Sequence, residues 1–132
     1  MHAETNSISR EITKFYDEYF KKEKLATSYI ELLLMIDDYE KISQKGLAEK
    51  MNLAPSTITR FISKLEKRGW VSKMMDGRLS YIALSEKGMK NVPELRIKYE
   101  QAEKDLKELL GSKFVDTTKQ LLAHGAALLQ DR

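Results

Sequence analysis

Residues 44–70 read QKGLAEKMNLAPSTITRFISKLEKRGW, and this stretch decides the fold of the chain. Its pattern predicts a helix that follows Ser43, a tight turn at Asn52, and a second helix between Pro55 and Gly69. Asn tolerates the left-handed backbone of such a turn, Pro suits a first helical turn, and Gly commonly follows a helix end. Two helices joined by so short a turn form a helix-turn-helix.

The second helix of this pair has two chemically different faces. Its apolar residues recur at spacings of three and four, so we expect one face to be buried; they are Ile58, Phe61, Ile62 and Leu65. The opposite face carries hydroxyls and cations, and its candidate DNA-contacting residues are Ser56, Thr57, Thr59, Arg60, Ser63 and Lys64. Short hydroxyls reach phosphates or base edges, and the guanidinium of Arg60 suits a guanine edge. The alternative is a solvated helix face.

Two short strands follow the helix pair. Residues 70–74 and 80–84 read as strands, and the Asp-Gly pair between them is a strong hairpin signal. A helix-turn-helix followed by a hairpin is a winged helix, and the hairpin tip can reach the groove beside the recognition helix. Arg78 near the tip is a candidate for the minor groove, with Asp76 as its hydrogen-bonding partner. The alternative is that both are turn residues joined by a weak surface ion pair.

Helical periodicity frames this region on both sides. Before it, we expect helices from Ile8 to about Phe20 and from Thr27 to Tyr39. After it, we expect a helix from Ser85 to about Leu110, with a disturbance at Pro93, and a last helix from about Lys113 to Leu129. The expected fold class is mainly α: a winged helix-turn-helix, with a three-helix core and a β-hairpin wing, flanked by N- and C-terminal dimerisation helices.

One domain of 132 residues is expected. Residues 27–87 are predicted to form the DNA-binding lobe, and residues 1–26 and 88–132 the dimerisation helices. The terminal helices carry apolar stripes outside the small winged-helix core, namely Ile8, Ile12, Phe15 and Tyr19, and Leu121, Leu122, Leu128 and Leu129. Exposed stripes would form a large apolar patch, so we expect a two-fold homodimer that places two recognition helices about one DNA turn apart. The alternative is that both helices fold back on their own core.

Charge is distributed unevenly along the chain, whose net charge is +3. Residues 41–90 hold eleven Lys and Arg against four Asp and Glu, whereas residues 1–40 hold five against nine. A local positive field suits a polyanion. The balance therefore favours double-stranded DNA as the partner over the alternative function, a winged-helix protein-interaction scaffold that does not read DNA.

Other chemistry has little support in the sequence. There is no Cys, the two His are far apart, and no phosphate-binding loop, zinc motif or catalytic set stands out. We therefore expect no metal, no cofactor and no enzymatic activity. The longest apolar run is too short to span a bilayer, and the first residues lack the pattern of a signal peptide, so a soluble cytoplasmic protein without membrane contact is expected.

These motifs together resemble the MarR family of winged-helix transcriptional regulators. The matching segments are Leu47-Ala48, residues 55–60, residues 65–69, residues 76–78 and residues 84–88. The resemblance implies a homodimer that binds a pseudo-palindromic operator, usually as a repressor. It assigns Ser56, Thr57, Thr59 and Arg60 to recognition-helix contacts and Arg78 to the wing. Ala54 departs from the pattern, because a capping serine often precedes the proline in the family.

The same resemblance allows a small aromatic or anionic effector, bound where the dimerisation helices meet the DNA-binding lobe. Candidate lining residues are Tyr16, Tyr19, Phe20 and Tyr29. The alternative is that these aromatic side chains belong to the core, which is the commoner role of aromatics at helical spacing.

Overall fold

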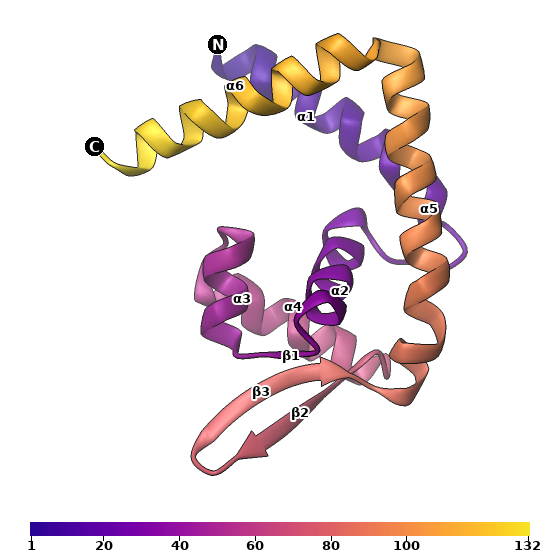
Figure 1. The fold of residues 1–132 in the computed structure, drawn as a ribbon, viewed down its shortest axis with the longest axis vertical. Helices are drawn as coiled ribbons and strands as arrows, with labels where there is room; N and C mark the ends of the chain where they lie inside the picture. The colour runs from indigo at the N-terminus through magenta and orange to yellow at the C-terminus, as the bar shows by residue number, and fades with distance from the viewer.

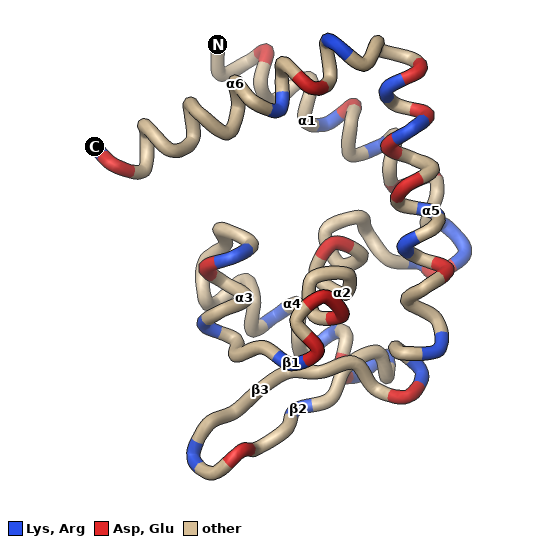
Figure 2. Tube along the Cα trace, in the orientation of Figure 1, with Lys and Arg blue, Asp and Glu red and all other residues tan.

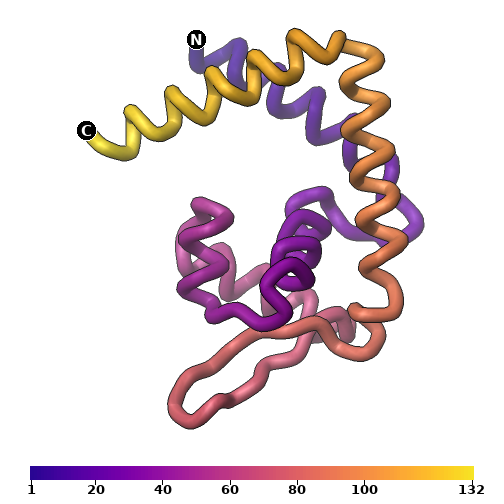
Figure 3. Tube along the Cα trace, viewed as in Figure 1, coloured from indigo at the N-terminus to yellow at the C-terminus, as the bar shows by residue number.

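The computed structural model describes residues 1–132 and has one lobe at the end of a long helical arm (Figure 1). Its elements are α1 (His2–Asp17), the 3-10 helix η1 (Glu18–Phe20), α2 (Thr27–Tyr39), β1 (Lys41–Ile42), α3 (Gln44–Met51), α4 (Pro55–Lys67), β2 (Val71–Asp76), β3 (Leu79–Leu84), α5 (Glu86–Leu110) and α6 (Ser112–Gln130). Helices α2, α3 and α4 and the strands form the lobe, α5 leads away from it, and both termini lie at the far end, as the trace in Figure 3 shows. The mainly α winged-helix fold with flanking helices is confirmed.

The wing is a hairpin with a two-residue loop. Strands β2 and β3 pair up to Asp76 and Leu79, which leaves only Gly77 and Arg78 in the loop. Gly77 has a φ of 63°, and a positive φ at the first loop residue alone is the type II′ geometry that fits the twist of the strands. The strands therefore extend further toward the tip than predicted. Strand β1 was not predicted, and it completes a sheet of order β1-β3-β2.

The lobe is built around one cluster of 19 buried residues. Ile58, Ile62 and Leu65 of α4 are completely buried, as predicted, but Phe61 is only half-buried. The cluster also takes in residues from both flanking segments, namely Phe20, Leu25, Val92 and Leu95. The core thus crosses both predicted boundaries of the lobe, which ties the start of α5 rigidly to the DNA-binding lobe.

The terminal helices differ in how closely they pack on the rest of the chain. Helix α1 begins earlier than the predicted Ile8 and packs on α5, where Tyr16, Ala102 and Leu106 form a second buried cluster. Helix α5 continues through Pro93 without ending, because its first turns are held by the lobe core. Helix α6, by contrast, buries only Val115. The C-terminal helix is therefore the element with the most uncovered apolar surface.

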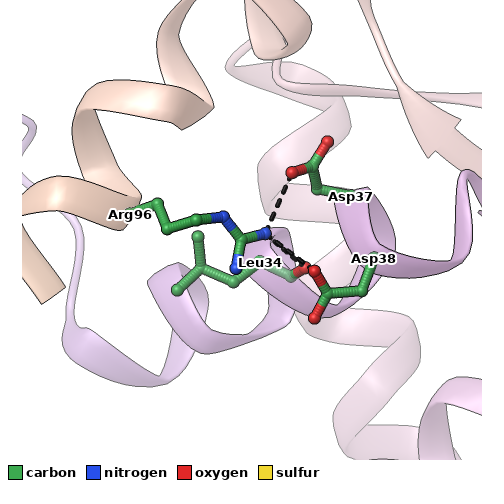
Figure 4. A network of polar contacts seen from close by, with 4 residues as sticks. All are labelled: Leu34, Asp37, Asp38 and Arg96. Atoms are coloured by element: carbon green, nitrogen blue, oxygen red, sulfur yellow. Dashed lines mark hydrogen bonds and ion pairs between the residues drawn. The ribbon is translucent and has the colours of Figure 1, made fainter. Parts of the chain in front are cut away.

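An arginine fastens α5 to the end of α2 (Figure 4). The Arg96 guanidinium donates to the Leu34 carbonyl at 3.3 Å and lies 2.9 Å from a carboxylate oxygen of both Asp37 and Asp38. These contacts raise the pKa of Arg96, with the Asp37 hydrogen bond as the largest cause. A cation at a helix C-terminus also meets the negative end of the helix dipole. The contact fixes the angle between α5 and the lobe.

The start of α5 packs against the backbone of Trp70, which leaves no room for a side chain at Gly88. Ser85 Oγ accepts the Gly88 N–H at 3.0 Å and so caps the helix. A Cβ on Gly88 would lie 2.3 Å from the Trp70 carbonyl oxygen. We expect Gly88→Ala to destabilise the fold by roughly 1–3 kcal/mol, because forced overpacking shifts the backbone. Thermal denaturation followed by circular dichroism measures the change.

Gly125→Ala is the matched control, since it makes the same substitution inside a helix. No atom lies within 4 Å of a Cβ built at Gly125, and Ala is favoured over Gly in a helix by about 1 kcal/mol. The midpoint temperature of thermal denaturation should be unchanged or higher in the Gly125→Ala variant. If Gly88→Ala and Gly125→Ala lower the midpoint temperature equally, the contact with Trp70 is not the cause of the destabilisation.

Candidate DNA-binding surface

The turn between α3 and α4 is set by local backbone chemistry. Ser43 Oγ accepts the Gly46 N–H at 2.9 Å and caps α3. Asn52 adopts the left-handed conformation, with φ 54° and ψ 47°, as predicted. Helix α4 then begins at Pro55 with no side-chain cap, because Ala54 offers no acceptor. The first N–H groups of α4 carry the positive end of the helix dipole, so they can receive a phosphate.

The outer face of α4 remains open while its inner face is buried. The predicted contact residues Ser56, Thr59, Arg60 and Lys64 are exposed, and Thr57 and Ser63 are half-buried. The Thr59 hydroxyl donates to the Pro55 carbonyl at 3.0 Å, so its proton is used within the helix. Arg60 has neither a hydrogen bond nor an ion pair and can turn its guanidinium outward.

At the wing tip, the predicted pairing of Asp76 with Arg78 is wrong. Asp76 Oδ2 instead lies 3.6 Å from Lys41 Nζ, and the same ammonium stands 5.1 Å from the centre of the Tyr81 ring. The unpredicted strand β1 supplies this competing cation. Arg78 is exposed and has no partner in the chain. Figure 2 shows basic residues at the wing tip and on α3 and α4.

Tyr29 of α2 packs against α4 and is not part of the lining of the cavity between the terminal helices and the lobe. Its ring stacks on Phe61 with centroids 4.4 Å apart, and Lys64 Nζ lies 4.8 Å from its centre. This contact covers one face of the Phe61 ring, which is half-buried. A shift of α2 at Tyr29 would therefore move the middle of α4 at Phe61.

Arg68 ties the C-terminal end of α4 to the turn that precedes α2. Its guanidinium donates to the carbonyl oxygens of Lys24, at 2.7 Å, and Glu23. Lys24 has a φ of 56°, and this left-handed turn presents both carbonyls on one side. Sequence reasoning did not single out Arg68, because nothing in a Lys-Arg-Gly helix end indicates a partner so far away in the chain.

The four aromatic residues predicted to line an effector pocket are not brought together. Phe20 is completely buried in the lobe core, Tyr29 lies under α4, and the Tyr19 hydroxyl donates to Asp105. That bond raises the pKa of Tyr19 to about 12 and lowers the pKa of Asp105. Tyr16 lines a cavity of about 310 Å³ bounded by α1, the start of α2, α5 and α6, and the other three aromatic residues are not part of that lining.

The apolar stripes of the terminal helices have different surroundings. Ile12 and Phe15 of α1 and Tyr19 of η1 pack against the small cluster that α1 forms with α5, whereas Ile8 is exposed. On α6, by contrast, the leucines stay uncovered: Leu121 is 65% exposed, Leu122 50%, Leu128 60% and Leu129 65%. Residues 120–130 carry no Lys, Arg, Asp or Glu, as the uncharged length of α6 in Figure 2 shows. A contiguous apolar face of this kind is typical of an interaction surface.

Two further features bear on other functions. No group of three or more His, Asp or Glu side chains lies close enough to hold a metal ion. None of the helices combines the length and apolar composition that crossing a membrane requires.

Known sequences place the chain among bacterial regulators. The model of the MarR family matches residues 27–77. The HTH-type transcriptional regulator SarZ of Staphylococcus haemolyticus is 34% identical over 100 residues, which cover 74% of this chain and 68% of that protein. SarZ of Staphylococcus epidermidis is 39% identical over 84 residues, with coverages of 61% and 56%. An uncharacterized HTH-type regulator of Bacillus anthracis is 33% identical over 72 residues, with coverages of 54% and 49%. The chain thus spans about half the length of the last two relatives.

Solved structures agree in fold. A mutant of MarR from E. coli in complex with operator DNA superimposes with a TM-score of 0.82 at 16% identity, covering 93% of this chain and 91% of that one. Ligand-free NadR gives a TM-score of 0.82 at 16% identity, with coverages of 98% and 96%. The relatives named here are transcriptional regulators, which are not enzymes. With this match in sequence and in fold, the chain belongs to the MarR family of winged-helix transcriptional regulators.

Proposed function

We propose that this chain is a homodimeric repressor that binds a pseudo-palindromic operator, with α4 in the major groove and Arg78 in the adjacent minor groove. One observation carries the proposal. Helix α4 buries Ile58, Ile62 and Leu65 on one side and leaves an unpaired arginine, short hydroxyls and an uncapped N-terminus on the other. Those groups suit base edges and phosphates, and no contact within the chain uses the guanidinium of Arg60.

The apolar face of α6 supports the dimer. Phe114, Leu121 and Leu128 recur every seven residues on one side of the helix and are at least half exposed. A second copy related by a two-fold axis would cover this stripe with an identical one. The E. coli protein MarR, which shares the fold, has been solved with operator DNA, and this supports the same mode of binding here.

A bound effector could change the position of α4 through α2. The cavity between the terminal helices and the lobe is lined by Thr27 and Ser28, and the next residue, Tyr29, stacks on Phe61 of α4. A ligand that displaces the start of α2 would therefore shift the recognition helix. In a dimer, such a shift changes the spacing of the two reading helices and releases the operator.

Selection of bound duplexes from a random library tests the proposal. We expect an enriched site with two symmetric halves whose centres lie about 10 base pairs apart, and an affinity that falls steeply with salt. The oligomeric state is measured on the same material by light scattering. A monomer with no preference over random duplex would overturn the proposal and favour the protein-interaction scaffold.

A further inference from the structure

The cavity of about 310 Å³ combines an apolar wall with acidic side chains. Its apolar lining comes from α1, α5 and α6 and includes Ile12, Leu106, Phe114 and Leu122. Its charged lining consists of Glu31, Glu103 and Lys119. A concave apolar site with a few polar groups is the usual form of a small-molecule site, and the charged groups decide which molecule it accepts.

The charges in the cavity do not balance. Lys119 Nζ lies 3.0 Å from Glu103 Oε1, so these two groups neutralise one another. Glu31, which is half-buried, accepts a hydrogen bond from the Tyr99 hydroxyl at 2.7 Å and has no Lys or Arg partner within the chain. One carboxylate therefore faces the cavity without a counter-charge.

The neighbouring tyrosines respond to this negative field. The pKa of Tyr16 is raised to about 12, first by burial and then by the charges of Glu103 and Glu31. The pKa of Tyr99 is also raised, by burial and by its hydrogen bond to Glu31. The contribution of the two carboxylates to these shifts disfavours an anion in the cavity and favours a cation, whereas burial disfavours either charge.

We propose that the effector of this chain is an organic cation with an apolar body, whose positive charge sits on Glu31 while its body fills the apolar part of the cavity. The inference rests on the proposed function, in which this cavity is the effector site. It favours a cation over the anionic alternative that the family resemblance allows, because the fold places the carboxylate of Glu31 in the cavity lining.

Binding of a cation to Glu31 would also affect how the DNA-binding lobe is held against α5. The bond of Glu31 to Tyr99 joins α2 to α5. Arg96, one turn before Tyr99 on α5, donates to the carbonyl of Leu34, one turn after Glu31 on α2 (Figure 4). A cation that draws the Glu31 carboxylate toward itself competes with the Tyr99 hydroxyl. It thereby loosens one of several polar contacts that hold the DNA-binding lobe to α5, which also include those of Arg96 to α2 and of Lys87 Nζ to the Arg68 carbonyl at 2.8 Å.

Calorimetric titration of the full chain with benzyltrimethylammonium, a permanent cation, and with phenylacetate, an anion of similar size, tests the proposal. We expect the cation to bind and the anion not to bind. Glu31→Gln should weaken cation binding at least tenfold, since the amide keeps the shape but loses the charge. Lys119→Gln should strengthen it several-fold, because it frees the carboxylate of Glu103. Glu108→Gln is the control, with the same loss of charge on α5 outside the cavity lining, and should leave the affinity unchanged.

Three results would overturn the proposal: phenylacetate binding as tightly as the cation, Glu31→Gln binding the cation like the unaltered chain, or neither probe binding. An unchanged operator affinity at saturating cation would refute the effector role. Operator binding by the unliganded chain is measured separately. If the unliganded chain does not bind an operator, the proposed function is wrong. The titrations use the protein without DNA and test only the charge preference of the cavity. Failure of the proposed function and failure of the cation proposal are therefore distinguishable.

Discussion

Arg60→Ala is expected to weaken binding to the selected operator by about 1–3 kcal/mol, because it removes the one long planar donor on the open side of α4. The same change should weaken binding to random duplex much less, since a base contact contributes only at the correct sequence. Fluorescence anisotropy with both duplexes at one fixed salt concentration measures the two losses. The fold should be unaffected, because Arg60 is exposed and makes no hydrogen bond or ion pair within the chain.

Arg132→Ala is the charge-matched control for this experiment. It removes the same guanidinium from the exposed end of the chain, beyond α6, and should leave both affinities nearly unchanged. Lys64→Ala offers a second comparison, since a lysine that contacts phosphate contributes to both duplexes alike. Equal losses on operator and random duplex in Arg60→Ala would show that this guanidinium contacts the backbone and does not read a base.

Placing glutamates on the α6 stripe is expected to convert the proposed dimer to a monomer. Leu121 and Leu128 are 65% and 60% exposed in the single chain, and burial of each leucine in an interface contributes roughly 1.5–3 kcal/mol. Leu121→Glu combined with Leu128→Glu removes this gain in both copies and would bury charges without partners. Light scattering should show the monomer mass, and operator affinity should fall by at least about a hundredfold, since two linked half-site contacts become one.

Gln130→Glu adds a charge to the same helix on the side opposite Leu121. It should preserve both the dimer and the operator affinity. Circular dichroism establishes that the double variant keeps its helices, which is expected because neither leucine packs in the core of its own chain. A double variant that remains dimeric would place the interface elsewhere.

The helix pair, the turn and the hairpin could be predicted because their signals are local. Ile58, Ile62 and Leu65 lie on one side of a helix through spacing alone, and they are buried as that spacing requires. Asn52 and the Asp-Gly pair determine backbone angles within one or two residues. The open side of α4 follows from the buried side, so the positions of Arg60 and its neighbours on that surface needed no tertiary information.

Features that depend on two distant segments could not be predicted. Strand β1 is two residues long and has no period of its own; it exists because β3 offers it an edge. Lys41 of β1 forms an ion pair with Asp76, which therefore does not pair with Arg78. Likewise, Tyr29 and Phe20 look like equivalent aromatic residues in the sequence, yet one stacks on α4 and the other is sealed in the core.

The sequence by itself determined the family, the winged helix and the side of α4 that stays open, because periodicity and turn chemistry act within a few residues. Only the tertiary structure determined which charged side chains lie close together. It brought Glu31 of α2 beside Tyr99 of α5 in a cavity that α6 also lines, and it gave Glu103 a cationic partner while leaving Glu31 without one. Electrostatic balance depends on distances in space, and the linear order of charges does not contain them.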